Sequence, residues 1–289
     1  MIGPFWRVDF SCLQLLLCEK AGLWYNREYK KMGGFAYMKI VRAKWKDECF
    51  YAALDGDVLR PLRGEPFDRI EEDGRSIPLA QAQLLAPCRP GKVVAVGLNY
   101  LDHIKEMNDP MPDEPVIFIK PASAVIGPGE AIVCPKRSSR VDYEAELAAV
   151  IGRRCKNVTA QEAPQYILGY TCINDVTARD IQPIDGQWTR AKGFDTFAPI
   201  GPCIETEFDP ADAPIQSVLN GKVCQDGNTS MMMRSVSELV AFISGVMTLE
   251  PGDVVTTGTP EGVGPMQPGD TVEVRIGGIG TLSNPVAAE

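Results

Sequence analysis

Residues 142–146 read DYEAE, and this short acidic stretch decides how the rest of the chain is interpreted. A β-strand places alternate side chains on the same face, so Glu144 and Glu146 are predicted to lie side by side. The same face continues as Ala148 and Val150, and it therefore becomes apolar within one further step. Carboxylates beside a buried face need a partner, and a hard divalent cation is the commonest partner of a carboxylate cluster.

A second segment supplies a third carboxylate. The apolar run at residues 167–173 ends just before Asp175, which lies within the sequence NDVTARD at residues 174–180. Three carboxylates without a nearby His or Cys favour Mg²⁺, Mn²⁺ or Ca²⁺ over Zn²⁺. Each motif alone has an ordinary explanation, because a Glu-x-Glu strand commonly faces solvent and Asp175 suits a turn or a helix N-cap. The two motifs together favour a metal site.

The composition narrows the class of protein and of partner. A chain of 289 residues with 45% hydrophobic and 23% charged residues is typical of a soluble globular protein with one large domain, or a large and a small one. The net charge of −9 argues against nucleic acid as a partner, and no apolar run is long enough for a transmembrane helix. Neither nucleic acid nor a membrane is therefore an expected partner.

The cysteines and the turn residues indicate the compartment and the fold class. The nine Cys contain no C-x-x-C pair, which argues against a disulfide framework or a zinc site and favours a reducing, cytoplasmic location. The 27 Gly and 23 Pro cluster between short β-like runs, so a strand-rich fold with many turns is expected.

Residues 1–37 differ from the remainder of the chain. They are rich in Trp, Leu and Cys, and they lack the basic start and cleavage site of a secretory signal. One interpretation is an N-terminal helix packed on the body. The interpretation that we favour is a non-native, translated leader or a disordered extension, because Met38 opens a clean strand pattern and Gly33-Gly34 can be encoded by a purine-rich ribosome-binding sequence upstream of it. Mass spectrometry of the natively expressed chain should find an N-terminus at Met38, and one at Met1 would contradict the leader.

The remaining sequence predicts two regions. Residues 38–87 form a small β-rich domain, with a hairpin in which strands at 48–54 and 58–62 flank Asp55-Gly56-Asp57. Residues 88–289 form the metal-binding catalytic domain. Its expected elements are strands at 92–98 and 116–119 and helices at 102–108 and 235–247. No repeat, P-loop or dinucleotide-binding context is present.

Six motifs occur in a specific order. They are VGLNYLDHIKEM at 96–107, FIKP at 118–121, DYEAEL at 142–147, NDVTARD at 174–180, KGFD at 192–195 and TGTPEGVG at 257–264. On these motifs the chain resembles the fumarylacetoacetate hydrolase family over roughly residues 88 to 285. The resemblance implies a mixed, β-rich α+β fold, with the β-roll core of that family's C-terminal domain and a small N-terminal β domain. It also implies a homodimer, and one Mg²⁺ or Mn²⁺ held by Glu144, Glu146 and Asp175.

The resemblance also assigns the other site residues. His103, the only histidine, and Glu106 would form a pair on a lid that activates water, with Lys192 as a further catalytic residue. Substrate-contacting positions are Arg179, Gln182 and Thr259. The alternatives without a function are a packing role for His103 and exposure to solvent at the surface for Arg179 and Lys192. A substrate role and a structural role for Lys120 cannot be separated from the sequence.

One position of the sequence departs from the fumarylacetoacetate-cleaving members of the family, and this narrows the expected reaction. Members that cleave fumarylacetoacetate carry an additional acidic metal-site residue at the position that aligns with Val96. The chain instead resembles shorter bacterial members that act on 2-oxo acids. The leading hypothesis is a hydrolase or lyase that cleaves a C–C bond in a 2-oxo acid, by acylpyruvate hydrolysis or oxaloacetate decarboxylation, with the cation stabilising an enolate. The alternatives are an isomerase of the 2-hydroxyhepta-2,4-diene-1,7-dioate type and a metal-binding protein without catalysis.

Overall fold

Strands β11 (Ala145–Ile151) and β12 (Ile167–Asn174) form the centre of the fold. The computed structural model describes residues 38–108 and 110–289, so the interpretation of residues 1–37 as a leader lies outside the described residues. The two strands pair antiparallel, with Ala145 opposite Asn174. All of β11 is buried, because apolar clusters cover both of its faces. The predicted acidic strand is interrupted at Glu144, which lies between β10 (Val141–Tyr143) and β11.

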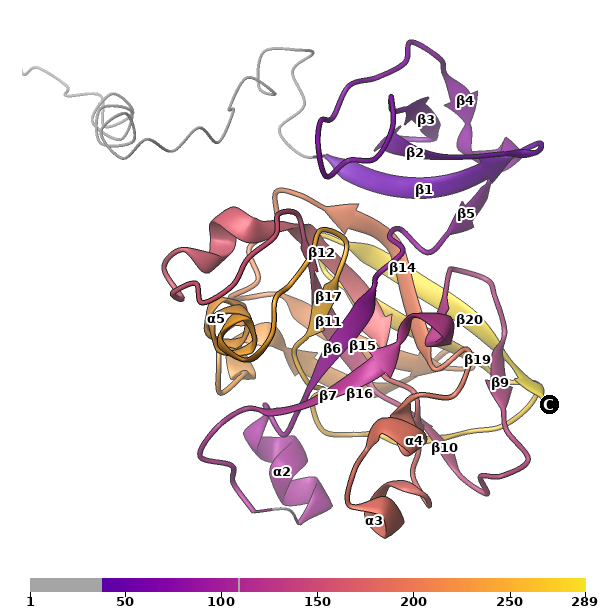
Figure 1. Ribbon diagram of the computed structural model, residues 1–289. Coiled ribbons are helices and arrows are strands. Elements are labelled where there is room, and N and C mark those ends of the chain that lie inside the picture. The colour runs from indigo at the N-terminus through magenta and orange to yellow at the C-terminus, as the bar shows by residue number, and fades with distance from the viewer. Residues whose placement is uncertain (1–37, 109) are drawn as a thin grey trace, which may run out of the picture. The chain divides into compact units, whose positions relative to one another are not determined.

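The large sheet extends from this pair in both directions (Figure 1). On one side lie β17 (Val254–Thr256), β6 (Lys92–Gly97) and β7 (Val116–Pro121). On the other side lie β14 (Ala198–Glu205), β1 (Lys39–Trp45), β2 (Glu48–Asp55), β3 (Val58–Pro61) and β4 (Ile77–Pro78). β5 (Gln83–Leu85) pairs with β1, and β8 (Val125–Ile126) pairs with β14. The small N-terminal region and the core therefore share one continuous sheet.

The predicted hairpin is present as β2 and β3. Asp55 pairs with Val58, which leaves Gly56 and Asp57 as a two-residue turn. Gly56 has a φ of 57°, a left-handed conformation that glycine adopts without steric cost. Turn chemistry in the sequence therefore sets this register directly.

Two smaller sheets complete the fold. A five-stranded sheet contains, in spatial order, β16 (Lys222–Asn228), β15 (Pro214–Leu219), β19 (Thr271–Ile276), β20 (Gly280–Ala288) and β9 (Ile132–Cys134). A three-stranded sheet joins β13 (Thr177–Ala178), β10 and β18 (Gly264–Met266). Leu147 and Ile151 on one face of β11 share a core cluster with Ile215 and Val274 of the five-stranded sheet. This packing gives the β-rich α+β fold that the sequence predicted.

Within residues 38–108 and 110–289 the helices are few and short. They are α2 (Leu101–Met107), α3 (Gln182–Asp185), α4 (Thr189–Lys192) and α5 (Val236–Val246), together with single 3₁₀ turns at 79–81, 122–124, 163–166 and 229–231. α5 confirms the predicted helix at 235–247, apart from Met247, which is extended and only half-buried. Ser235 and Glu238 form a capping box at its start, a feature that contributes about 1 kcal/mol to helix stability.

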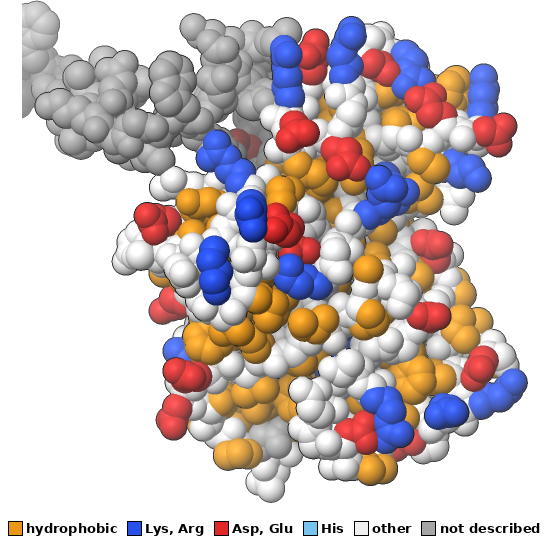
Figure 2. All heavy atoms as spheres, in the orientation of Figure 1, with side chains coloured by type: hydrophobic (Ala, Val, Ile, Leu, Met, Phe, Trp, Pro, Cys, Tyr) orange, Lys and Arg blue, Asp and Glu red, His pale blue; other side chains and the backbone are white. Residues whose placement is uncertain are grey.

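The surface carries charges of both signs. Figure 2 shows acidic and basic side chains intermixed over the visible face. Arg75, for example, contacts both Glu48 and Asp73. Within residues 38–108 and 110–289, no helix combines the length and apolar character needed to cross a membrane.

Candidate active site

A cavity of about 380 Å³ gathers residues from distant parts of the chain. Its lining includes all of the predicted site residues except Glu106, namely His103, Glu144, Glu146, Asp175, Arg179, Gln182, Lys192 and Thr259. These residues come from α2, the β10–β11 junction and the start of β11, the segment just after β12, the turn between β13 and α3, helices α3 and α4, and the loop after β17. The antiparallel pairing of β11 with β12 brings two of these segments together.

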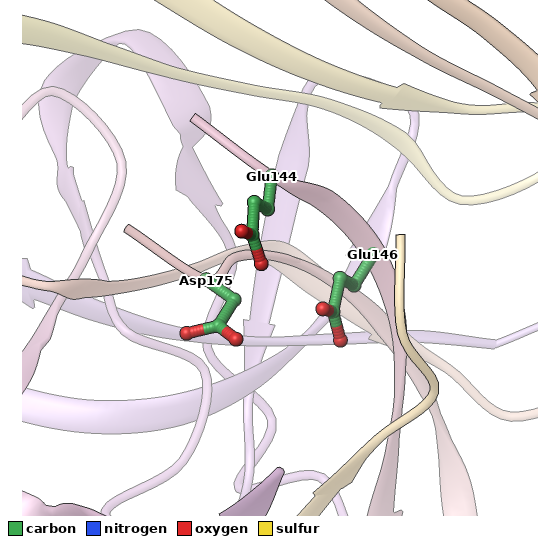
Figure 3. A group of neighbouring side chains, drawn as sticks. All are labelled: Glu144, Glu146 and Asp175. Atoms are coloured by element: carbon green, nitrogen blue, oxygen red, sulfur yellow. The ribbon is translucent and has the colours of Figure 1, made fainter. Parts of the chain in front are cut away.

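Three carboxylates converge in this cavity (Figure 3). Glu144, Glu146 and Asp175 each offer one oxygen, and these oxygens all lie within 4.8 Å of one another. The backbone fixes the arrangement, because the Asp175 N–H donates to the Glu144 carbonyl at 2.9 Å. The Glu144 N–H in turn donates to Asn174 Oδ1 at 2.9 Å. The predicted grouping of the three acids is confirmed in space.

Three cations neutralise two of these acids. Lys192 Nζ donates to Glu144 Oε2 at 2.7 Å and to Asp175 Oδ2 at 2.8 Å. Arg179 pairs with the other oxygen of Glu144, and Lys120 pairs with the other oxygen of Asp175. Burial raises the pKa of Glu144, but the charges of Lys192 and Arg179 outweigh burial and hold that pKa well below its usual range.

Glu146 is in a different electrostatic position. It is 1% exposed, and among residues 38–108 and 110–289 it forms no ion pair. The Gly258 N–H donates to its Oε2 at 2.9 Å. Burial, followed by the charges of Asp175 and Glu144, raises its pKa well above the usual range. Glu146 therefore needs a positive partner. Together with Glu144 and Asp175 it forms a set of three oxygen donors that fits Mg²⁺ or Mn²⁺.

His103 and Glu106 form the predicted pair. They lie three residues apart on α2, with 2.9 Å between His103 Nδ1 and Glu106 Oε2. The Gly262 N–H donates to the other oxygen of Glu106 at 3.0 Å, so the loop after β17 orients the carboxylate. A carboxylate at Nδ1 favours the tautomer with its proton on Nδ1, which leaves Nε2 able to accept one. Glu106 therefore acts on the cavity through His103.

The predicted substrate-contacting residues are already engaged with the protein. The Arg179 guanidinium donates to Asp142 at 2.9 Å and to Gln182 at 2.6 Å, in addition to its pair with Glu144. The Thr259 hydroxyl donates to the Ala145 carbonyl at 2.9 Å and accepts from Gln225 Nε2 at 2.7 Å. Their contact with substrate stays a prediction.

Comparison with known proteins assigns the family. Residues 92–287 match the family described as fumarylacetoacetate (FAA) hydrolase C-terminal, and residues 38–87 match the Rv2993c-like N-terminal family. The chain belongs to the fumarylacetoacetate hydrolase family. The resemblance inferred from the six motifs is therefore confirmed, and members of this family are enzymes.

Three relatives illustrate the range of the family. Protein Rv2993c of Mycobacterium tuberculosis is 51% identical over 86% of this chain and 98% of its own length. The mitochondrial oxaloacetate tautomerase FAHD2A of Homo sapiens is 43% identical over 73% of this chain and 71% of its own. The crystal structure of 2-hydroxyhepta-2,4-diene-1,7-dioate isomerase from Mycobacterium marinum is 48% identical, with a TM-score of 0.82, and covers 87% of this chain and 99% of that one.

The structure adds residues that sequence reasoning missed. Asp142 is fully buried and is held by Arg140 at 2.8 Å as well as by Arg179. Its place in the DYEAE stretch was a signal that went unused. Gln225 gave no signal, because β16 reaches the site only through the five-stranded sheet.

Lys120 is fully buried behind Asp175 and does not line the cavity, which favours the structural role that the sequence left open.

An apolar wall was also missed, and one glycine shapes it. The wall includes Leu98, Met107, Pro183 and Trp188. A Cβ atom on Gly97 would lie 2.4 Å from the indole ring of Trp188, whose ring packs edge-on against Phe118 at 5.3 Å between centroids. The absence of a side chain at Gly97 therefore leaves the space that the indole occupies.

Gly97→Ala is expected to move the Trp188 ring and lower kcat/KM by roughly tenfold to a hundredfold, because small displacements of a cavity wall misplace substrate. Gly245→Ala is the matched control, since an added Cβ there meets nothing within 4 Å and the position lies in α5. Steady-state kinetics of both variants provides the measurement. A Gly97→Ala enzyme with wild-type kcat/KM would show that the wall does not control binding.

The raised pKa of Glu146 predicts how metal stabilisation depends on pH. Because the folded-state pKa exceeds the unfolded one, the contribution of Glu146 to stability is present at low pH and is lost as pH rises through the folded pKa. Mg²⁺ binds only the ionised carboxylate of Glu146, so the binding of Mg²⁺ releases the proton from that group. The increase in Tm caused by Mg²⁺ should therefore grow as pH rises through the raised, folded-state pKa of Glu146. Thermal unfolding with and without Mg²⁺ tests this, and an increase that shrinks with pH would contradict it.

Proposed function

We propose that this chain is a divalent-metal-dependent enzyme that acts on a 2-oxo acid through the enol or enolate form of its substrate. The observation that carries the proposal is that three buried carboxylates and the His103–Glu106 pair meet at one cavity. Glu144, Glu146 and Asp175 would hold the cation. When bound, Mg²⁺ or Mn²⁺ supplies Lewis acidity that stabilises negative charge developing on the 2-oxo oxygen.

The chain's own residues supply binding and proton transfer. Lys192 and Arg179 line the cavity, and their charge suits them to a substrate carboxylate once the cation has bound. Glu106 holds His103 Nδ1, so the imidazole can take a proton at Nε2 from the substrate carbon or from water and return it later. The apolar wall that includes Trp188 offers a contact surface for the apolar part of a substrate.

The reaction best supported is proton transfer between the C3 carbon and the 2-oxo oxygen, that is, keto–enol tautomerisation of an oxaloacetate-type diacid. Support comes from the relatives named oxaloacetate tautomerase and 2-hydroxyhepta-2,4-diene-1,7-dioate isomerase, at 43% and 48% identity. Proton transfer also needs only groups that the cavity contains. C–C cleavage, the leading hypothesis from sequence, is the second candidate, because the His103–Glu106 pair also suits activation of a water molecule.

Three assays on one preparation test the proposal. Chelator-treated protein is supplied with Mg²⁺ and measured for enol-to-keto conversion of oxaloacetate, for pyruvate release from oxaloacetate, and for pyruvate release from acetylpyruvate. Metal-dependent conversion without pyruvate identifies the tautomerase, whereas pyruvate release identifies C–C cleavage. Protein that binds Mg²⁺ but turns over none of these substrates would contradict the proposal and favour a non-catalytic metal-binding role.

A further inference from the structure

The ammonium group of Lys192 occupies the space between two of the candidate metal ligands. Its Nζ atom lies 2.7 Å from Glu144 Oε2 and 2.8 Å from Asp175 Oδ2, and its side chain is 3% exposed. The other oxygen of Glu144 pairs with Arg179, and the other oxygen of Asp175 pairs with Lys120. Every oxygen of these two acids therefore already has a cationic partner.

The three cations differ in their freedom to move. Lys120 is 0% exposed, also donates to the Val176 carbonyl at 3.0 Å, and does not line the cavity. Arg179 is anchored by Asp142 and Gln182. Within the described residues, the Lys192 ammonium group donates hydrogen bonds only to the two acids and lies 5.1 Å from the centroid of the Phe118 ring. Unlike Lys120 it borders the cavity, and unlike Arg179 it has no second hydrogen-bonded anchor outside the two acids. Lys192 is therefore the cation that can leave.

A dication cannot join this arrangement without cost. Mg²⁺ binds oxygen at about 2.1 Å, so an ion that coordinates both Glu144 and Asp175 would lie within a few ångströms of the ammonium group. Like charges at such distances repel strongly in a buried site. We propose that Lys192 is the resident cation of the metal-free site, and that a dication displaces its ammonium group into the cavity.

The displacement gives Lys192 a second role. In the cavity the ammonium group would meet the carboxylate of a 2-oxo acid, a step that rests on the proposed function. Metal binding then precedes substrate binding, because the lysine is released for substrate only after the dication has taken its place. The Lys192 ammonium group thus couples the binding of the metal to the binding of the substrate.

Calorimetric titration with Mn²⁺ alone tests the exchange. Lys192→Met removes the competing charge, so Mn²⁺ should bind roughly tenfold more tightly than to the wild type. Arg190→Met is the matched control, because Arg190 lies on the same helix α4 but is exposed and pairs with Asp185. Its affinity for Mn²⁺ should equal that of the wild type. Pyruvate added to the Mn²⁺-loaded proteins should bind more weakly to Lys192→Met than to either of the others.

Thermal unfolding separates exchange from a simple structural role. Metal-free Lys192→Met should have a lower Tm than the wild type, and Mn²⁺ should restore it; Lys192→Gln serves as a second variant. Unchanged or weaker Mn²⁺ binding, or variants that stay unfolded with Mn²⁺, would overturn the inference. So would unchanged pyruvate affinity. A wild type that binds no Mn²⁺ would instead contradict the proposed function itself.

Discussion

Glu146→Gln is expected to abolish turnover and to weaken Mg²⁺ binding by at least roughly a hundredfold, more than the usual effect of removing a group that merely supports a ligand. The physical reason is that Gln retains the shape of the side chain but cannot carry the charge that balances a dication with a costly dehydration. The same variant should be at least as stable as the wild type without metal, because a buried carboxylate that lacks an ion pair within the described residues is removed.

Calorimetric Mg²⁺ titration, turnover and thermal unfolding together check this prediction. Glu205→Gln is a suitable control, because Glu205 is also a buried carboxylate with a raised pKa but lies on β14 and does not line the cavity. Its variant should keep wild-type Mg²⁺ affinity. Full activity of the wild type in excess chelator would remove the metal hypothesis.

If the chain is an acylpyruvate hydrolase, the second candidate above, His103→Ala is expected to lower acetylpyruvate hydrolysis by about 10²–10⁴-fold, the usual effect of losing a general base. Decarboxylation of oxaloacetate needs no attacking water, so the variant should keep much of any decarboxylase activity. Both activities should disappear in Glu146→Gln, because both depend on stabilisation of negative charge at the 2-oxo oxygen. Paired turnover of the two substrates by wild type and both variants is the measurement.

The possible results assign His103 to different roles. If hydrolysis by His103→Ala is intact, the residue is structural and the pair has no catalytic part. If both activities fall equally, His103 handles a proton common to both reactions. Enol-to-keto conversion should fall with hydrolysis if His103 carries the proton in the tautomerase reaction.

The homodimer and the cytoplasmic location stay predictions.

Local patterns determined much of this protein. The hairpin at β2 and β3 follows from a glycine suited to a left-handed turn, and α5 follows from a capping box and an apolar stripe. The spacing of His103 and Glu106 on a helix likewise places them together. In each case the residues that decide the structure lie within a few positions of one another, so propensity and periodicity suffice.

Only the tertiary structure decided how the charges pair. The family resemblance assigned Arg179 to substrate contact and Lys192 to catalysis, yet Arg179 contacts Glu144, and Lys192 contacts both Glu144 and Asp175. It could not place Lys120 behind Asp175, and it gave no sign of Gln225. These contacts join residues that are 17 to 80 positions apart. They depend on how β11, β12 and the five-stranded sheet pack, and no local pattern encodes that packing. The sequence by itself therefore determined which acids gather. The packed strands determined which cations neutralise Glu144 and Asp175, and among the residues that the structure describes they place no cation in an ion pair with Glu146.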